Sequence, residues 1–373
     1  MWRLVLTLAA YMIGALVLSA CGSDGSIPEA TVPAPTSDGN PRTFEMGLSS
    51  LPSQLTEESY EDAFERAGRA GDVVLIQRTP PWSEMISGDL SGDTIAATQR
   101  EVELAEEEGL AIFFAIDPTE EIEGTSQLAG LPENLRGAGF DNAQVRDAFV
   151  SYAQYVAENY RPKYLALGVE INSYQQQHPE DFERFVIVYH EAYEAVKAFS
   201  PDTLIFPTFQ FEELQGLLPV GDPRPPQWHL ISRFEPRLDM VAVSSFPSLA
   251  FADPQLIPPS YYAQIPSHTD HPIAISALGY ASGPGPEGSV SGATEEKQAQ
   301  FLQRTLDTAS QLQFSMVIWF VGQDPTFESD GGFEEFRRTG LVRENGAEKL
   351  AWSIWQSVAV RALTPIVEPT PIP

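Results

Sequence analysis

The chain has 373 residues and a formal charge of −30, with 52 Asp and Glu residues against 22 Lys and Arg residues. Such a charge repels phosphate backbones, so the composition argues against nucleic acid as a partner. A single cysteine excludes internal disulfides and cysteine zinc sites. Folding must therefore depend on a hydrophobic core.

The N-terminus has the layout of a secretory signal. Arg3 is followed by an apolar run from Leu4 to Leu18, and small residues precede Cys21. Residues 18–21 resemble the bacterial lipobox, whose cysteine is acylated and becomes the new N-terminus after cleavage. We therefore expect a signal peptide over 1–20, a lipid on Cys21, and an extracytoplasmic protein anchored to a membrane, at the cell surface or in the periplasm. A spanning helix and an ordinary buried cysteine are the alternatives, but the apolar run is short for a bilayer core.

Two segments have compositions that do not form a core. Residues 21–42 are rich in Gly, Ser, Pro, Asp and Thr, and they are predicted to be a disordered tether. Residues 364–373 carry four prolines and are predicted to be a second disordered end. The folded part is then a single domain over residues 43–363.

Within this domain, short apolar runs alternate with longer amphipathic stretches, which is typical of parallel strands joined by crossover helices. Eight such strands are predicted: 44–48, 73–77, 111–116, 164–168, 203–207, 240–244, 273–276 and 316–320. Eight βα units in about 320 residues favour one α/β domain, a closed (β/α)₈ TIM barrel. A doubly wound open sheet is the alternative.

Helix signals occur between these runs. Asp141 with Gln144 opens a stretch that has apolar residues at helical spacing, and Thr294 starts another. The last helix is predicted over residues 347–363. One face of it is expected to carry Leu350, Ile354, Trp355 and Val358.

The active sites of such barrels lie where the strands end, so the residues that follow each apolar run are the candidates for function. They are Arg78, Trp82, Asp117, Glu170, Asn172, Tyr174, Gln210, Phe246, Tyr280, Trp319, Gln323 and Asp324. Aromatic rings mixed with carboxylates and amides suit sugars, which stack on rings and hydrogen-bond through hydroxyls.

Four motifs in order along the chain resemble those of clan A glycoside hydrolases, including endo-β-1,4-galactanases and cellulase-like enzymes. They are YLALGVEIN from Tyr164, SSFP from Ser244, HPIAISALGYAS from His271, and VIWF from Val317. The resemblance implies that Glu170 is the general acid/base. It also implies that Trp319 is the tryptophan that floors the sugar subsite. With them, Trp82, Asn172, Gln210 and Tyr280 are predicted to bind the sugar.

The departures from that family concern the same subsite. The strand-seven position of the nucleophile is Ala277, and a methyl group is no nucleophile. Val169 stands in place of the asparagine that usually precedes the acid/base, and Phe246 replaces a tyrosine. Retaining hydrolysis needs two carboxylates about 5 Å apart. Three concerted changes suggest that the glycosyl-enzyme chemistry has been abandoned.

The leading hypothesis is a lipid-anchored protein, expected to be a monomer, that binds a β-linked oligo- or polysaccharide with lost or impaired hydrolysis. One alternative is an active glycosidase in which Asp117 or Asp324 supplies a second carboxylate. Another is a structural lipoprotein, in which side chains would fill the mouth of the barrel.

We expect no metal or cofactor. The string that begins at His190 and Glu191 lacks the second histidine of a metalloprotease, and an exposed helix face is the favoured interpretation. The glycine-rich loop 283–288 does not match a phosphate-binding fingerprint. Glu287 in this loop is a minor candidate for folding over the mouth.

Overall fold

The computed structural model describes residues 39–122, 125–217, 225–251, 253–284, 292–327 and 336–364. The predicted signal peptide, Cys21, most of the tether, Glu287 and residues 365–373 lie outside these ranges. Within them, no helix is long and apolar enough to cross a membrane.

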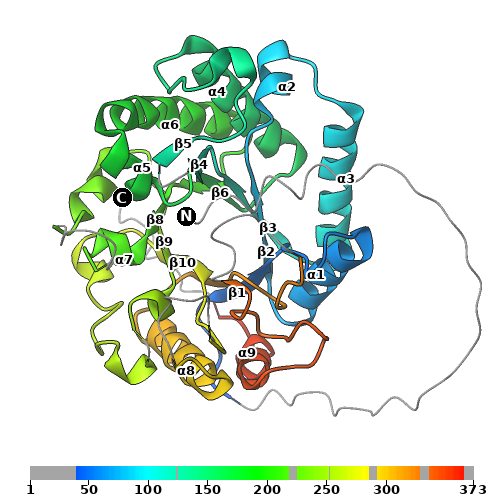
Figure 1. Cartoon of the computed structure of the whole chain (residues 1–373), viewed down its shortest axis with the longest axis vertical. Coiled ribbons are helices and arrows are strands. Elements are labelled where there is room, and N and C mark those ends of the chain that lie inside the picture. Colours follow the sequence, from blue (N-terminus) through cyan, green and yellow to red (C-terminus); the bar gives the residue numbers. More distant parts are fainter. Residues whose placement is uncertain are drawn as a thin grey trace, which may run out of the picture.

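The chain forms a parallel barrel surrounded by helices, which confirms the predicted fold class (Figure 1). The barrel strands are β1 (Glu45–Ser49), β2 (Val73–Arg78), β3 (Ala111–Ile116), β6 (Tyr164–Leu167), β7 (Leu204–Phe206), β8 (Thr208–Gln210), β9 (Val241–Ser245), β10 (Ile273–Leu278) and β11 (Met316–Trp319). All eight predicted strands are present. The structure adds a two-stranded hairpin, β4 (Thr119–Ile122) with β5 (Thr125–Leu128), which the sequence pattern does not predict.

The barrel closes through its fifth strand. Only Pro207 separates β7 from β8, and proline has no N–H to donate to a sheet. On one side β7 pairs with β6, and on the other β8 pairs with β9. The two segments therefore act as one strand, and nine segments give the eight strands of the barrel.

Helices cover the outside of the barrel. They are α1 (Glu57–Arg69), α2 (Trp82–Ser87), α3 (Gly92–Glu107), α4 (Ala143–Asn159), α5 (Ile171–Gln177), α6 (Pro179–Phe199), α7 (Phe211–Leu214), α8 (Glu295–Gln311) and α9 (Leu350–Ala359). Short 3₁₀ turns are η1 (Glu133–Leu135), η2 (Trp228–Phe234), η3 (Pro247–Leu249), η4 (Pro254–Leu256) and η5 (Ile265–Ser267). The prediction of one long helix per strand is wrong for the described parts of the β8–β9 and β9–β10 connections, which hold only short helices.

The helix ends differ in part from the predictions. The N-cap of α4 is Asn142 rather than Asp141, because the Asn142 side chain accepts from the backbone N–H groups of Gln144 and Val145. Thr294 does cap α8, as predicted. The last helix is shorter than predicted, and Leu350 is 51% exposed, so it does not belong to the buried face.

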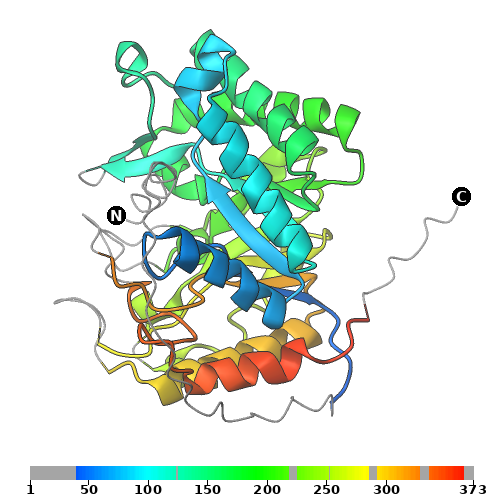
Figure 2. The ribbon, with the colours of Figure 1, turned by 90° about the vertical axis from the view of Figure 1, so that its right-hand side faces the viewer.

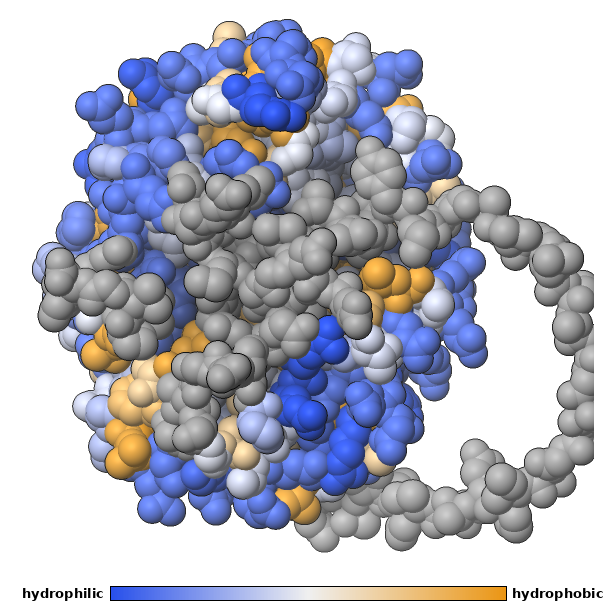
Figure 3. Space-filling view, in the orientation of Figure 1, coloured by the Kyte–Doolittle hydropathy of each residue, from blue (hydrophilic) through white to orange (hydrophobic). Residues whose placement is uncertain are grey.

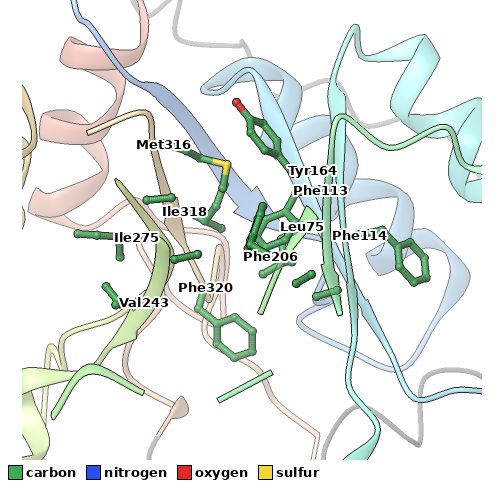
Figure 4. Close-up of a cluster of buried hydrophobic side chains, with 14 of the residues drawn as sticks. Leu75, Phe113, Phe114, Tyr164, Phe206, Val243, Ile275, Met316, Ile318 and Phe320 are labelled. Carbon is green, nitrogen blue, oxygen red and sulfur yellow. The ribbon is translucent and has the colours of Figure 1, made fainter. Parts of the chain in front are cut away.

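The interior of the barrel is filled by side chains from alternate positions of each strand. On the last strand, Met316 and Ile318 point into the cluster drawn in Figure 4, and Phe320 continues the same face. The intervening Trp319 therefore faces the helices. Each fully buried aliphatic or aromatic side chain of this kind contributes roughly 1.5–3 kcal/mol by leaving water.

Candidate functional site at the barrel mouth

A small cavity lies where the barrel strands end. Its volume is about 40 Å³. The lining residues come from most of the strands: Leu75, Gln77, Phe113, Ala115, Asp117, Val169, Glu170, Thr208, Ser244, Phe246, Ser276, Ala277, Phe320 and Phe336. Of the residues predicted to be catalytic or sugar-binding in the leading hypothesis, the structure brings only Glu170 to this cavity. Asp117, predicted as a second carboxylate in the alternative, also lines it.

The backbone aims Glu170 into the cavity. The chain leaves β6 through Gly168, whose φ of 109° and close neighbours leave no room for a side chain; a Cβ there would lie 2.6 Å from Ile171. Glu170 itself has a φ of 48°, in the left-handed region that non-glycine residues seldom adopt. Such strain is typical of functional positions.

Two hydroxyl groups hold Glu170. Its backbone N–H donates to Thr208 Oγ1 at 3.0 Å, and its Oε1 accepts from Ser244 Oγ at 2.5 Å. The side chain is only partly buried, so its carboxylate is not sealed in the core. Glu170 can therefore accept a hydrogen bond from a ligand or, when protonated, donate one.

The wall contributed by β10 carries Ala277. The pairing register of β10 shifts between Ile275 and Ala277, which marks a bulge of the kind that re-aims side chains near sites. Both Ser276 and Ala277 line the cavity. Ser276 Oγ is buried and has no hydrogen-bond partner among the described residues. A cavity of about 40 Å³ can hold a water for it, since one water needs roughly 10–15 Å³.

Three phenylalanines that line the cavity pack against one another. The ring centroids of Phe246 and Phe320 lie 6.1 Å apart, those of Phe246 and Phe336 5.1 Å, and those of Phe320 and Phe336 5.4 Å. Pockets that enclose small ligands typically measure about 300–1,000 Å³. The cavity is therefore too small to enclose a sugar ring in this arrangement.

Asp117 is the second carboxylate of the cavity. It is 2% exposed and accepts from Gln77 Nε2 at 3.0 Å. It follows β3, which is the direct neighbour of β6 in the sheet. Asp117 and Glu170 therefore approach the cavity from adjacent strands, whereas Ala277 lies on a strand across the barrel.

The aromatic residues predicted to bind sugar lie in the protein core. Trp82 is 1% exposed and donates from Nε1 to the Ala129 carbonyl at 2.6 Å. Trp319 donates to the Thr339 carbonyl at 2.9 Å, and Tyr280 donates to the Phe251 carbonyl at 3.0 Å. Each polar end is thus satisfied by backbone, and none of the three rings lines the cavity.

The predicted amide contacts serve the loops around the mouth. Asn172 is fully buried, accepts from the Gln210 N–H at 2.8 Å, and donates to the Gln210 carbonyl at 3.1 Å. The Gln210 side chain caps α7 by accepting from the Glu213 N–H at 2.6 Å. These bonds fasten the end of β8 to α5.

The remaining candidates at strand ends also have structural partners. Arg78 forms a part-buried ion pair with Glu101, and Tyr174 donates to Asp181. Gln323 accepts from Arg66. Asp324 forms an ion pair with Lys349 and does not line the cavity. In the described ranges, no group of three or more His, Cys, Asp or Glu residues is placed to hold a metal.

Glu212 is a fully buried carboxylate directly behind the mouth. Its oxygens accept from Tyr261 at 2.5 Å, Ser245 at 2.7 Å and Gln210 at 2.5 Å, and from the Phe246 N–H at 3.3 Å. Burial raises the pKa of Glu212, and these donors lower it in part. The residue ties the ends of β8 and β9 to the loop that carries Tyr261.

We expect Glu212 to make the folded state less stable as the pH rises. Its raised pKa means that the folded state holds a proton more tightly than the unfolded state. The free energy of unfolding therefore falls as the pH rises from the ordinary pKa of about 4.5 through the raised pKa. Chemical denaturation at several pH values should show this fall in the wild type. Glu212→Gln should show a smaller fall, whatever its absolute stability, and exposed Glu180→Gln should leave the wild-type slope unchanged. Equal slopes for the wild type and Glu212→Gln would contradict the prediction.

No protein-family model matches this sequence, and no curated protein matches it. Solved structures do match. A Glu-to-Ala variant of GH5_18 from Bifidobacterium longum subsp. longum ATCC 55813, in complex with Manβ1-4GlcNAc, is 17% identical, with a TM-score of 0.64 over 86% of this chain and 80% of that one.

Two further matches are more distant in sequence. The exo-β-1,4-mannosidase Op5Man5 from Opitutaceae bacterium strain TAV5 is 14% identical, with a TM-score of 0.62 over 86% of this chain and 59% of that one. Xylanase 10B from Thermotoga maritima is 13% identical, with a TM-score of 0.56 over 85% of this chain and 95% of that one. The chain thus shares the barrel fold of clan A glycoside hydrolases.

Proposed function

We propose that this protein is exported, is anchored to a membrane by a lipid on Cys21, and binds a β-linked glycan at the barrel mouth without hydrolysing it. The observation that carries the proposal is that Glu170 and Ala277 line the same cavity. On this proposal Glu170 keeps the carboxylate of the acid/base position, while the opposite wall offers only a methyl group. One similar structure contains Manβ1-4GlcNAc, which supports a β-linked ligand.

A site that keeps Glu170 but lacks the nucleophile is better suited to binding a glycan than to cleaving it. A retaining mechanism requires a carboxylate that attacks the anomeric carbon from the side opposite the acid. Ala277 supplies none, and Ser276 beside it is an alcohol that no base contacts among the described residues. Glu170 with Ser244 still presents an acceptor to sugar hydroxyls. Phe246, Phe320 and Phe336 form a phenyl cluster that leaves the cavity too small for a sugar ring. The glycan would therefore lie across the rim of the cavity.

A second candidate is an active glycosidase that uses Asp117, since Asp117 and Glu170 share the cavity. Inverting hydrolysis needs the base on the far side of the sugar from the acid, with about 6.5–9.5 Å between the carboxyl groups. Adjacent strands place the two carboxylates on one side of the mouth. Sugar release that is abolished by both Glu170→Gln and Asp117→Asn would establish this candidate.

A third candidate, a structural lipoprotein without a ligand, is favoured by the filled mouth. The sequence-based expectation for such a protein is a mouth occupied by side chains, and a cavity of about 40 Å³ fits it. The surface in the orientation of Figure 1 is mostly hydrophilic where it is coloured, with apolar residues in small separate patches (Figure 3). Ligand binding in solution distinguishes this candidate from the other two.

We expect isothermal titration with a panel of β-linked oligosaccharides to detect binding by the unlipidated Cys21→Ser chain. Glu170→Gln should weaken that binding by about 1.5–3 kcal/mol, the usual contribution of a hydrogen bond to a charged group. Glu180→Gln, an exposed change in the first turn of α6, is the matched control and should bind as the wild type does. Absence of binding to every member of the panel would overturn the proposal in favour of the structural candidate.

A further inference from the structure

The two ends of the described domain are fastened to each other. The Arg42 N–H donates to the Ala362 carbonyl at 3.0 Å, and the Thr364 N–H donates to the Arg42 carbonyl at 2.8 Å. The Arg42 guanidinium is buried and pairs with Asp72 at 2.6 Å. Arg42 is part of the fold, and the chain enters the barrel at a fixed point.

This point lies at the base of the barrel, opposite the mouth. Arg42 comes just before the start of β1, whereas Glu170 and Asp117 follow the ends of their parallel strands. Figure 2 shows the first described residues, in blue, and the last, in red, at one end of the barrel, with the β4–β5 hairpin toward the other. The 21 residues of α6 run between these ends and span about 31 Å.

The position of Cys21 relative to Arg42 limits where a lipid can hold the domain. The 21 residues from one to the other reach at most about 75 Å, whatever their conformation. Because Arg42 is the point at which this segment enters the fold, a lipid on Cys21 would be joined to the domain at its base. The charge of −30 repels anionic headgroups and favours arrangements in which the rest of the domain stands away from the bilayer.

We propose that the mouth faces away from the membrane that holds the lipid, so that the glycan is taken from a polymer outside this membrane rather than from a lipid headgroup within it. This inference rests on the proposed function, both for the lipid on Cys21 and for the glycan at the mouth. It adds the source of the ligand, which the mouth residues alone do not specify.

Energy transfer from the two ends of α6 tests the orientation. Glu180 lies in its first turn and Ala198 near its last, both are exposed, and 18 residues separate them by about 27 Å. Because Cys21 is the only cysteine and would be acylated, Glu180→Cys or Ala198→Cys supplies the only free thiol for a fluorescent donor. The full-length lipidated protein is placed in phosphatidylethanolamine–phosphatidylglycerol vesicles that carry a headgroup-labelled acceptor.

We expect higher transfer from position 198 than from position 180. Equal transfer, or higher transfer from position 180, would overturn the orientation while leaving anchoring intact. Only higher transfer from position 180 would point to a lipid-linked source. Loss of transfer at both positions, as expected for a Cys21→Ser control, would instead overturn the anchoring on which the orientation depends. Glycan binding is measured separately by titration, so failure of the proposed function is distinguished from failure of the orientation.

Discussion

Replacement of Asp324 by alanine is expected to lower the free energy of unfolding by about 3–5 kcal/mol, because it leaves a buried ammonium group without its counter-ion. Lys349 is 3% exposed. Its Nζ lies 2.6 Å from Asp324 Oδ2 and also donates to Ser282 Oγ and the Gly340 carbonyl, both at 2.8 Å. Asp324 Oδ1 in turn accepts from the Gly340 N–H at 2.9 Å. The pair thus joins three segments around α8 and α9, and denaturant unfolding measures its loss.

Removal of both charges should cost far less than removal of one. Burial is the largest cause that raises the pKa of Asp324 and that lowers the pKa of Lys349, so the dehydration of the pair outweighs its mutual attraction. Asp324→Leu combined with Lys349→Met should therefore be more stable than Asp324→Ala alone. The exposed pair of Glu133 with Arg136 is the matched control, and Glu133→Ala should cost at most about 1 kcal/mol. A cost for Asp324→Ala as small as that of the control would contradict the buried-charge argument.

The sequence predicts the barrel well because its strands are buried on both faces. Runs such as 111–116 are continuous apolar stretches, and this pattern is independent of the direction in which each side chain points. The same pattern predicts neither the interruption at Pro207 nor the hairpin after β3. The interruption follows from the missing N–H of Pro207, and the hairpin depends on pairing between two neighbouring segments. Hydrophobicity alone encodes neither.

The site is harder to predict because successive side chains along a strand point to opposite faces of the sheet. The motif points to Trp319, but Met316 and Ile318 set the inward face, so Phe320 reaches the cavity instead. The alternation of positions in this strand is the signal that identifies Phe320. The backbone partners of Trp82 and Tyr280 come from distant segments, and neighbouring residues in the sequence therefore do not reveal the burial of these two rings.

The prediction with the largest expected effect on catalysis follows from the proposed loss of the nucleophile. We expect the unlipidated chain to release no reducing sugar from β-linked polysaccharides above the uncatalysed rate, and Glu170→Gln to change nothing. Enzymes accelerate such reactions by at least about 10⁶-fold, so even weak catalysis would be detected. Release by the wild type that Glu170→Gln abolishes would show that a catalytic pair exists without position 277.

Ala277→Glu should then give measurable release that depends on Glu170, provided that the rings of Phe246, Phe320 and Phe336 move to admit the sugar to the cavity. The bulge in β10 aims position 277 into the cavity, and a carboxylate there would supply the attacking group that the retaining mechanism requires. The double variant Ala277→Glu with Glu170→Gln is the control and should be inactive. If Ala277→Glu folds but releases nothing, the phenyl cluster of Phe246, Phe320 and Phe336 excludes the sugar from the cavity, and the lack of a carboxylate at position 277 is not the only barrier to hydrolysis.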